Sequence, residues 1–323
     1  MVMSAQPSGV DSDPTPEFNE QCTAVVDSWQ RGDLPFQEAI ARLNTFREKA
    51  AASGHVANQA RTEQLLGNIQ HFHGNLTTSV QHWERARTLF AQVNNQISVA
   101  GMDLNIGESF RFKGDFARAV RMFRTTYNIA SELGDLRIQT IATTNEGLAL
   151  VAMGQHSAAR NAFEKAFELL AGEWARDDQT TWVSLLCENH HGMATIHLEA
   201  GDLMEAWKQS LKALELTKDA ELPMQRGYAN RIAGQVVTQL GSAPAENWPD
   251  DPDEYFRTAL ESFREVNAEA ELARTMYAQA LSLAARGRRN TAARKLQQVM
   301  IIFSRLGMID DAARAAAAQL SIT

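Results

Sequence analysis

Glycine recurs in this 323-residue chain at a spacing that few folds can accommodate. In four pairs of glycines the two members are seven positions apart, and two further pairs keep this spacing with alanine as the first member. Ten of the 19 glycines fall in this pattern, and its second members follow one another at intervals of 40, 40, 47, 40 and 46 residues. Such a period indicates similar stacked units rather than one globular core. The pairs are Gly67/Gly74, Gly107/Gly114, Gly147/Gly154, Ala194/Gly201, Gly234/Gly241 and Ala280/Gly287.

The residues after each second glycine repeat as well. A small residue comes five positions later, and the residue four positions beyond it is aromatic in the clearest units. Because a step of four keeps both on one helical face, each unit is predicted to be an antiparallel helix pair. We expect the first glycine to let the neighbouring helix backbone approach closely, and the second to end its helix in a left-handed cap. The residues at these two places are Ser79/Trp83, Ala119/Phe123, Ala159/Phe163, Ala206/Ser210, Ala292/Leu296 and, after an inserted loop, Ala259/Phe263.

Two units show the full pattern, Gly107-x6-Gly114-Asp115-Phe116-x2-Ala119-x3-Phe123 and Gly147-x6-Gly154-x4-Ala159-x3-Phe163. In this respect the chain resembles the tetratricopeptide repeat (TPR) proteins over about residues 57–307. The resemblance implies an all-α fold, a right-handed α-solenoid of stacked antiparallel helix pairs. The period exceeds the usual 34 residues of that family and is similar to long-helix variants in kinesin light chain, spindle-orientation adaptors and bacterial peptide-sensing regulators. The segment Ile129–Asp135 is typical of the bacterial group.

We expect residues 1–16, rich in Ser, Pro and Asp, to be a disordered leader, and residues 17–56 to be a degenerate helix pair that caps the stack. Residues 308–323 are predicted to be a C-terminal capping helix. An inserted loop at 242–254 holds three prolines and five acids, which exclude regular structure. Its Trp248 either folds back on the neighbouring helices or acts as a lid over a partner. Six repeats are predicted at about 57–94, 97–134, 137–171, 180–219, 224–267 and 269–306.

Charge and composition exclude several classes of protein. The formal net charge of -8 argues against a nucleic-acid partner, whose binding depends on clustered cations. No stretch of about 18 apolar residues occurs, and the N-terminus lacks the pattern of a signal peptide, so we expect no membrane partner. The two cysteines, Cys22 and Cys187, make neither a disulfide framework nor a zinc spacing. A cytoplasmic location is therefore expected.

No motif in the sequence selects a reaction. His190 and His197 are seven positions apart, whereas a metal-binding helix needs ligands at i and i+4. The glycines form no phosphate-binding loop, and no Gly-x-Ser-x-Gly elbow occurs. We therefore expect a protein that is not an enzyme and that binds no cofactor or metal.

The first helices of the pairs are predicted to line the concave side of the solenoid, where side chains are not needed for packing. Asn105 and Asn145 take the same place in adjacent repeats. In similar peptide-binding long-helix TPR proteins, an asparagine there holds the peptide backbone, to which its amide offers both donors and an acceptor; alternatively, both are ordinary solvated residues. Arg111 would add a contact to a peptide acid. The predicted lining comprises Gln64, Asn68, His71, Asn105, Glu108, Arg111, Thr144, Asn145, Glu188, His191, Thr195, Arg231, Gln235, Thr238, Arg274 and Tyr277.

The preferred hypothesis is a non-catalytic scaffold or adaptor that binds a peptide or helical segment of a partner protein in the concave groove. One alternative is an assembly subunit, which joins a larger complex or a homo-oligomer through its convex face or ends. The other is a regulatory peptide sensor that acts on a separate output protein. About 50 residues precede the repeats, too few for a fused output domain.

Overall fold

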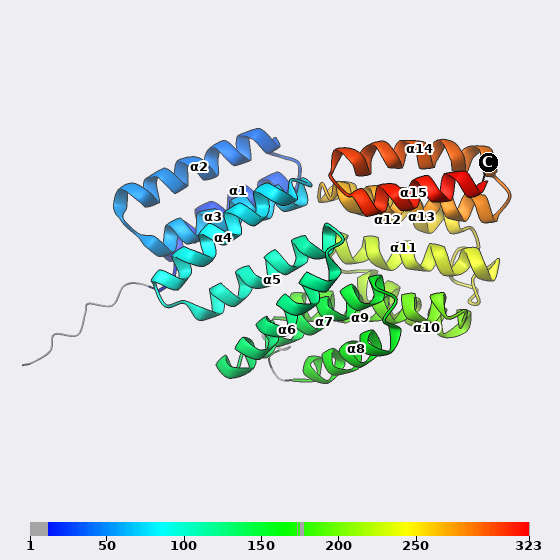
Figure 1. Cartoon of the computed structure of the whole chain (residues 1–323), viewed down its shortest axis with the longest axis horizontal. Coiled ribbons are helices and arrows are strands. Elements are labelled where there is room, and N and C mark those ends of the chain that lie inside the picture. The colour runs from blue at the N-terminus through cyan, green and yellow to red at the C-terminus, as the bar shows by residue number, and fades with distance from the viewer. Residues whose placement is uncertain (1–11, 173, 175–177, 323) are drawn as a thin grey trace, which may run out of the picture. The chain divides into compact units, whose positions relative to one another are not determined.

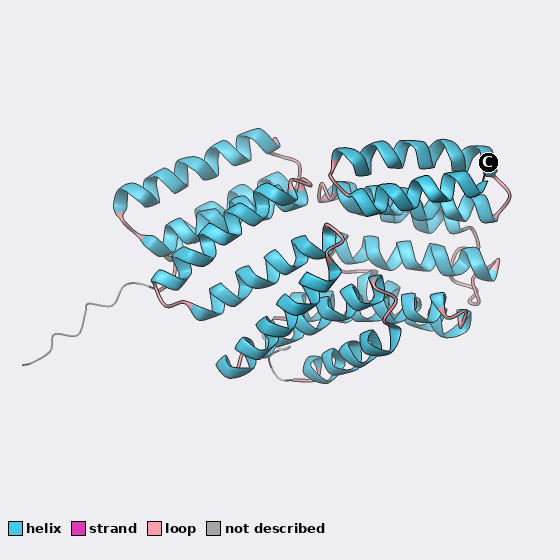
Figure 2. Cartoon of the chain, viewed as in Figure 1, coloured by secondary structure: helices cyan, strands magenta, loops and turns pink. Residues whose placement is uncertain are grey.

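The computed structural model describes residues 12–172, 174 and 178–322, in which fifteen α-helices and no strands occur (Figure 2). Contacts between residues divide the chain into two compact units. The first unit comprises residues 1–71 and 75–106, and the second comprises residues 72–74 and 107–323. The boundary falls inside helix α5 (Gln96–Phe112), to which both units contribute.

The first unit contains two helix pairs and the first part of α5 (Figure 1). Its helices are α1 (Pro16–Gln30), α2 (Phe36–Ser53), α3 (Val56–Phe72) and α4 (Leu76–Gln92). Ser12 and Asp13, which we expected to be part of a disordered leader, accept hydrogen bonds from the side-chain amide of Asn95 at 3.1 and 2.9 Å. Residues 1–11 of the predicted leader lie outside the described residues.

The second unit consists of helices in two alternating sets. Each odd-numbered helix from α7 to α15 contacts the next odd-numbered helix, and each of α8, α10, α12 and α14 packs against the helices before and after it. The all-α fold of stacked helix pairs is thus confirmed. The helices are α6 (Phe116–Leu133), α7 (Leu136–Ala152), α8 (His156–Leu170), α9 (Gln179–Glu199), α10 (Leu203–Thr217), α11 (Pro223–Leu240), α12 (Pro252–Glu265), α13 (Glu269–Ala285), α14 (Arg289–Arg305) and α15 (Ile309–Ile322).

The first glycine of a pair makes room for an aromatic ring, and not for a helix backbone as we expected. A Cβ atom placed on Gly147 would stand 2.5 Å from the ring of Phe163, and one on Gly107 would stand 2.8 Å from the ring of Phe123. Both phenylalanines are fully buried. The ring edge therefore occupies the space that a side chain on the first helix would need, which holds the two helices in one packed arrangement.

The fifth repeat departs from the predicted pairing. The ring that faces Gly234 belongs to Phe256, while Phe263 lies against Gly227, two helical turns earlier. The inserted loop is also shorter than predicted, because α12 begins at Pro252. Proline fits the first turn of a helix, where no backbone N–H is needed, and the acids Asp253 and Glu254 interact favourably with the helix N-terminus.

Three second glycines are followed directly by Asn or Asp, and only one of these residues caps the next helix with its side chain. Asp115 accepts from the backbone N–H of Arg118 at 3.1 Å. Asn75 and Asp202 stand at the same place but make no side-chain cap. Asn75 donates instead to Gln70, and Asp202 pairs with His197 at 3.2 Å. No described helix has the length and apolar character that a bilayer crossing requires.

Candidate functional site

A cavity of about 270 Å³ lies within the second unit and is walled by seven helices. Such a volume is slightly below the range of about 300–1,000 Å³ found for small-molecule sites. Most of the wall comes from the odd-numbered helices. The lining residues are Glu108, Arg111, Phe116, Leu148, Ala152, Glu188, His191, Tyr228, Arg231, Gln235, Glu271, Arg274, Tyr277, Ala278, Asp311 and Arg314.

Most of the titratable side chains in this cavity come from pairs of residues three positions apart on one helix. Four helices place an acidic residue at position i and a basic residue type at position i+3, and side chains three apart share a helical face. In α11 the same places are held by Tyr228 and Arg231. Five helices thus point the same pair of positions into one space. The acid and base pairs are Glu108/Arg111, Glu188/His191, Glu271/Arg274 and Asp311/Arg314.

Glu271 on α13 is the most enclosed acid of the cavity, with 3% of the residue exposed. Its carboxylate accepts from Arg231 at 2.5 Å and from Arg274 at 2.8 Å. Burial alone would raise the pKa of Glu271, but the two guanidinium groups outweigh it and bring the pKa to about 2. Glu271 is therefore ionised and neutralises part of the charge of both arginines.

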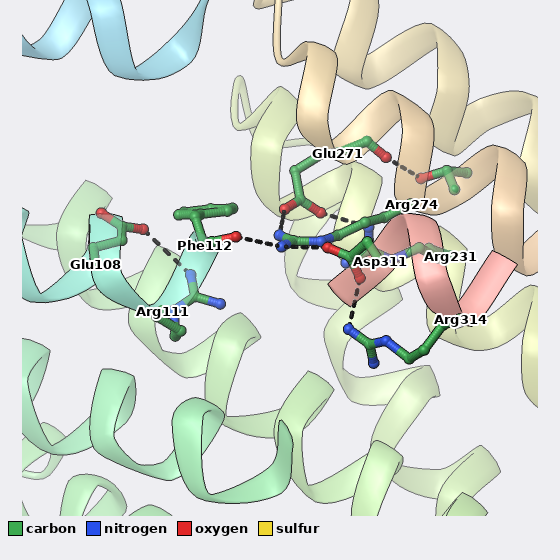
Figure 3. A network of polar contacts seen from close by, with 9 residues as sticks. Glu108, Arg111, Phe112, Arg231, Glu271, Arg274, Asp311 and Arg314 are labelled. Carbon is green, nitrogen blue, oxygen red and sulfur yellow. Dashed lines mark hydrogen bonds and ion pairs between the residues drawn. The ribbon is translucent and has the colours of Figure 1, made fainter. Parts of the chain in front are cut away.

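Arg274 connects three helices (Figure 3). Besides Glu271 on its own helix, it donates to Asp311 on α15 at 3.2 Å and to the backbone carbonyl of Phe112 at the end of α5 at 3.4 Å. Asp311 also accepts from Arg314 at 2.6 Å. The C-terminal end of α5 and the first turn of α15 are thereby held beside α13 at one edge of the cavity.

The groups near Arg111 are less completely paired. Among the described residues, Arg111 has one acid partner, Glu108, in a long ion pair of 3.4 Å, and its Nε is buried without a hydrogen-bond partner. Burial, with a smaller contribution from the charge of Glu108, raises the pKa of Glu188 to about 7. Burial and then the charge of Arg231 lower the pKa of His191 to about 3, so this imidazole is neutral.

Eight of the predicted lining residues meet in the cavity, namely Glu108, Arg111, Glu188, His191, Arg231, Gln235, Arg274 and Tyr277. Asn145 does not line it, and only 8% of this residue is exposed. Trp248 is also outside the lining; it packs against the core formed by α9–α12, as the first of its two interpretations supposed.

Thr144, Thr195 and Thr238 of the second unit do not line the cavity either. The other predicted residues, Gln64, Asn68, His71 and Asn105, belong to the first unit. Asn68 accepts from the indole N–H of Trp83 at 3.0 Å, and the ring of His71 lies 5.3 Å from that of Trp83. The backbone carbonyl of Gln64 accepts from the same indole at 3.2 Å. These three residues therefore surround a buried tryptophan between α3 and α4. Asn105 is half-buried in α5.

Sequence reasoning missed Tyr228, Glu271, Asp311 and Arg314 as site residues. Tyr228 and Glu271 stand three positions before the predicted Arg231 and Arg274, so extending the lining stripe by one helical turn would have found them. Asp311 and Arg314 lie in α15, which the sequence indicated only as a cap. That helix packs against α13 and α14 and also supplies part of the cavity wall.

His190, Cys22 and Cys187 lie outside the cavity and are buried. His190 pairs with Gln209 of α10 at 2.8 Å and its ring lies 5.0 Å from that of Phe167. Cys22 and Cys187 are both buried thiols. Among the residues that the structure describes, no group of three or more His, Cys, Asp or Glu side chains is placed to hold a metal ion.

Comparison with known proteins agrees with the repeat architecture. The tetratricopeptide repeat family profile matches residues 98–171, from α5 to the end of α8. A sequence comparison with curated proteins finds no significant match.

Three solved structures share the fold at low sequence identity. A Rap protein complexed with competence and sporulation factor has a TM-score of 0.64 and 13% identity, over 94% of this chain and 85% of that one. The Rap conjugation gene regulator of plasmid pLS20, in complex with the Phr* peptide, has a TM-score of 0.58 and 14% identity, over 84% and 77%. The apo quorum sensor NprR from B. thuringiensis has a TM-score of 0.55 and 12% identity, over 95% and 86%. The chain thus carries a tetratricopeptide-repeat match over residues 98–171 and shares the fold of these three structures.

Proposed function

We propose that the protein is a non-catalytic interaction module, a scaffold or adaptor that binds a short extended peptide of a partner protein in the cavity of the second unit. Every peptide unit offers one donor and one acceptor. The cavity provides donors on its arginines and acceptors on its acids, with Gln235 able to serve as either. A surface of this mixed kind suits a peptide better than a purely apolar ligand.

The proposal rests on one observation, the convergence of polar side chains from α5, α9, α11, α13 and α15 on a single space. Buried charges are costly unless they are paired or serve a purpose, and a packed solenoid does not require them. The small volume favours a short extended segment over a helix, whose diameter with side chains is about 10–12 Å.

The similar structures give independent support at the level of fold. Two of the three are complexes, one with competence and sporulation factor and one with the Phr* peptide. A shared fold does not by itself assign a ligand, but it makes a peptide the first class to test.

Affinity selection tests this function directly. The protein is incubated with a library of random hexapeptides, and the peptides that co-elute with it in gel filtration are identified by mass spectrometry. Ala152 lines the cavity, so Ala152→Phe should reduce peptide recovery about tenfold or more by filling the space, a loss of about 1.4 kcal/mol. Ala117→Phe, at an exposed position of α6, is the matched control. Recovery that is equal in both variants, or absent in the wild type, would contradict the proposal.

The same cavity would also serve a regulatory peptide sensor. Two of the similar structures are a gene regulator and a quorum sensor. A sensor must change shape on binding, since a ligand acts at a distance only by favouring one of two states. Hydrogen exchange with and without a selected peptide distinguishes the two roles: protection limited to the cavity wall supports an adaptor, and protection that extends through α14 supports a sensor.

A further inference from the structure

We propose that Arg111 and Glu188 form a subsite that receives a carboxylate of the peptide, an inference that rests on the proposed function. The two residues come from α5 and α9 and line the same cavity. The source of the carboxylate is either the peptide C-terminus or the side chain of an acidic residue, because both present the same planar group.

Arg111 differs from the other arginines of the cavity in its pairing. Arg231, Arg274 and Arg314 donate to Glu271 or Asp311 at 2.5 to 3.2 Å. Arg111 makes a 3.4 Å contact with Glu108, and its Nε has no hydrogen-bond partner among the described residues, although 16% of its side chain is exposed. A buried N–H of a charged group without a partner costs free energy, which a ligand acceptor would recover.

The geometry of a guanidinium fits this role. Its N–H groups form a rigid planar fork, and a carboxylate accepts two parallel hydrogen bonds from it. In Arg111 the unpartnered Nε–H and the weakly engaged Nη2 lie on the same edge of that fork. A carboxylate docked side-on would accept from both and displace only the long contact to Glu108.

The charge of Arg111 acts on titratable groups of three other helices in the cavity. It lowers the pKa of Glu188 and His191 on α9, of Tyr228 on α11 and of Glu271 on α13, although burial is the largest influence on all four groups. Glu271 is already neutralised by Arg231 and Arg274. The positive charge of Arg111 therefore stays available to an acid that enters the cavity.

Glu188 makes the subsite sensitive to pH. The groups that act on it are Glu108 and Arg111 of α5 and Gln225 of α11, whose amide donates to it at 3.1 Å. Its neighbours Cys187 and Tyr228 both have raised pKa values and stay neutral near pH 7. A protonated Glu188 donates a hydrogen bond to a ligand carboxylate, while an ionised Glu188 repels it.

Three hexapeptide libraries test the subsite by the same affinity selection. One has free C-terminal carboxylates and lacks Asp and Glu, one has amidated C-termini and contains Asp and Glu, and one is amidated and lacks both acids. The wild type should recover one or both acid-bearing libraries about tenfold or more above the acid-free library. The library that is enriched identifies the source of the carboxylate.

Arg111→Gln should abolish this preference, whereas Arg121→Gln, at an exposed position of α6, should preserve it. Equal recovery of all three libraries by the wild type, or a preference that survives Arg111→Gln, would overturn the inference. Failure of the proposed function looks different, because then no library is recovered at all.

A second measurement does not depend on how Arg111→Gln folds. Recovery of the preferred acid-bearing library by the wild type should fall between about pH 6 and about pH 8, as Glu188 loses its proton. In Glu188→Gln the recovery should be independent of pH over this interval. A flat profile in the wild type would remove Glu188 from the subsite.

Discussion

The guanidinium of Arg274 on α13 donates a hydrogen bond of 3.4 Å to the backbone carbonyl of Phe112, which stands 162 positions earlier at the end of α5. The ring of Phe112 also lies under the same guanidinium, 4.8 Å from it. One side chain thus links the first and last parts of the second unit, since Arg274 binds Asp311 of α15 as well.

Arg274→Ala should destabilise the second unit by about 1–3 kcal/mol, because Phe112 and Asp311 each lose a partner while Glu271 keeps Arg231. The loss should appear in urea denaturation and as faster hydrogen exchange in α15. Arg314→Ala removes a more exposed partner of the same Asp311, so its effect should stay below about 1 kcal/mol. Equal effects of the two variants would show that Arg274 does not link the helices.

Gly147→Ala should destabilise the protein by about 1–3 kcal/mol, since the new methyl group would stand 2.5 Å from the buried ring of Phe163. Gly101→Ala is the matched control. Gly101 also lies within a helix, but a Cβ atom there meets nothing within 4 Å. Gly101→Ala should therefore stabilise by up to about 1 kcal/mol through helix propensity. Thermal unfolding of both variants measures this difference in stability. Equal effects of the two substitutions would show that the glycines provide only backbone flexibility.

The pH dependence of stability should contain two opposite contributions from the cavity acids. The pKa of Glu271 falls from its ordinary 4.5 to about 2, so its contribution is present above pH 4.5 and is lost as the pH falls toward 2. The pKa of Glu188 rises from 4.5 to about 7, so its contribution is present below pH 4.5 and is lost as the pH rises toward 7.

Glu188→Gln should consequently raise the thermal midpoint relative to wild type at pH 8 and leave it nearly unchanged at pH 4, where Glu188 is already neutral in both states. Glu261→Gln, at an exposed position of α12, should shift the midpoint little at either pH. A Glu188→Gln effect of the same size at both values would show that Glu188 is not held in its neutral form by burial.

Asn105 and Asn145 provide a test of backbone recognition. Neither residue lines the cavity in which we propose that the peptide binds, so the double variant Asn105→Ala with Asn145→Ala should leave recovery of all three libraries unchanged. Arg111→Gln, in contrast, should weaken recovery of the acid-bearing libraries more than recovery of the acid-free library. Helical circular dichroism confirms that the double variant is folded, and a folded variant that recovers all three libraries less well would show that the asparagine pair holds the peptide backbone, whose amide contacts ignore side chains.

The sequence by itself determined the helices and their pairing. Glycines seven apart, followed by Ala159 and Phe163 at helical spacing, specify a local arrangement in which each helix packs on its neighbour in the chain. Such short-range patterns can be predicted from sequence because the contacts that they create, such as that of Gly147 with Phe163, join residues within one repeat. The charged lining stripe follows from the same short-range spacing, and the predicted residues Arg231 and Arg274 both line the cavity.

Only the tertiary structure decided which lining residues of different helices come together in the cavity. Asp311 enters the cavity, while Asn68 and His71, at predicted lining positions, gather around Trp83 in the first unit. Which side chains meet depends on the rotation and displacement between successive helix pairs. These accumulate over many residues, so the sequence of a single repeat does not reveal them. The bond between Arg274 and Phe112 exists because that accumulated geometry returns α13 to the end of α5.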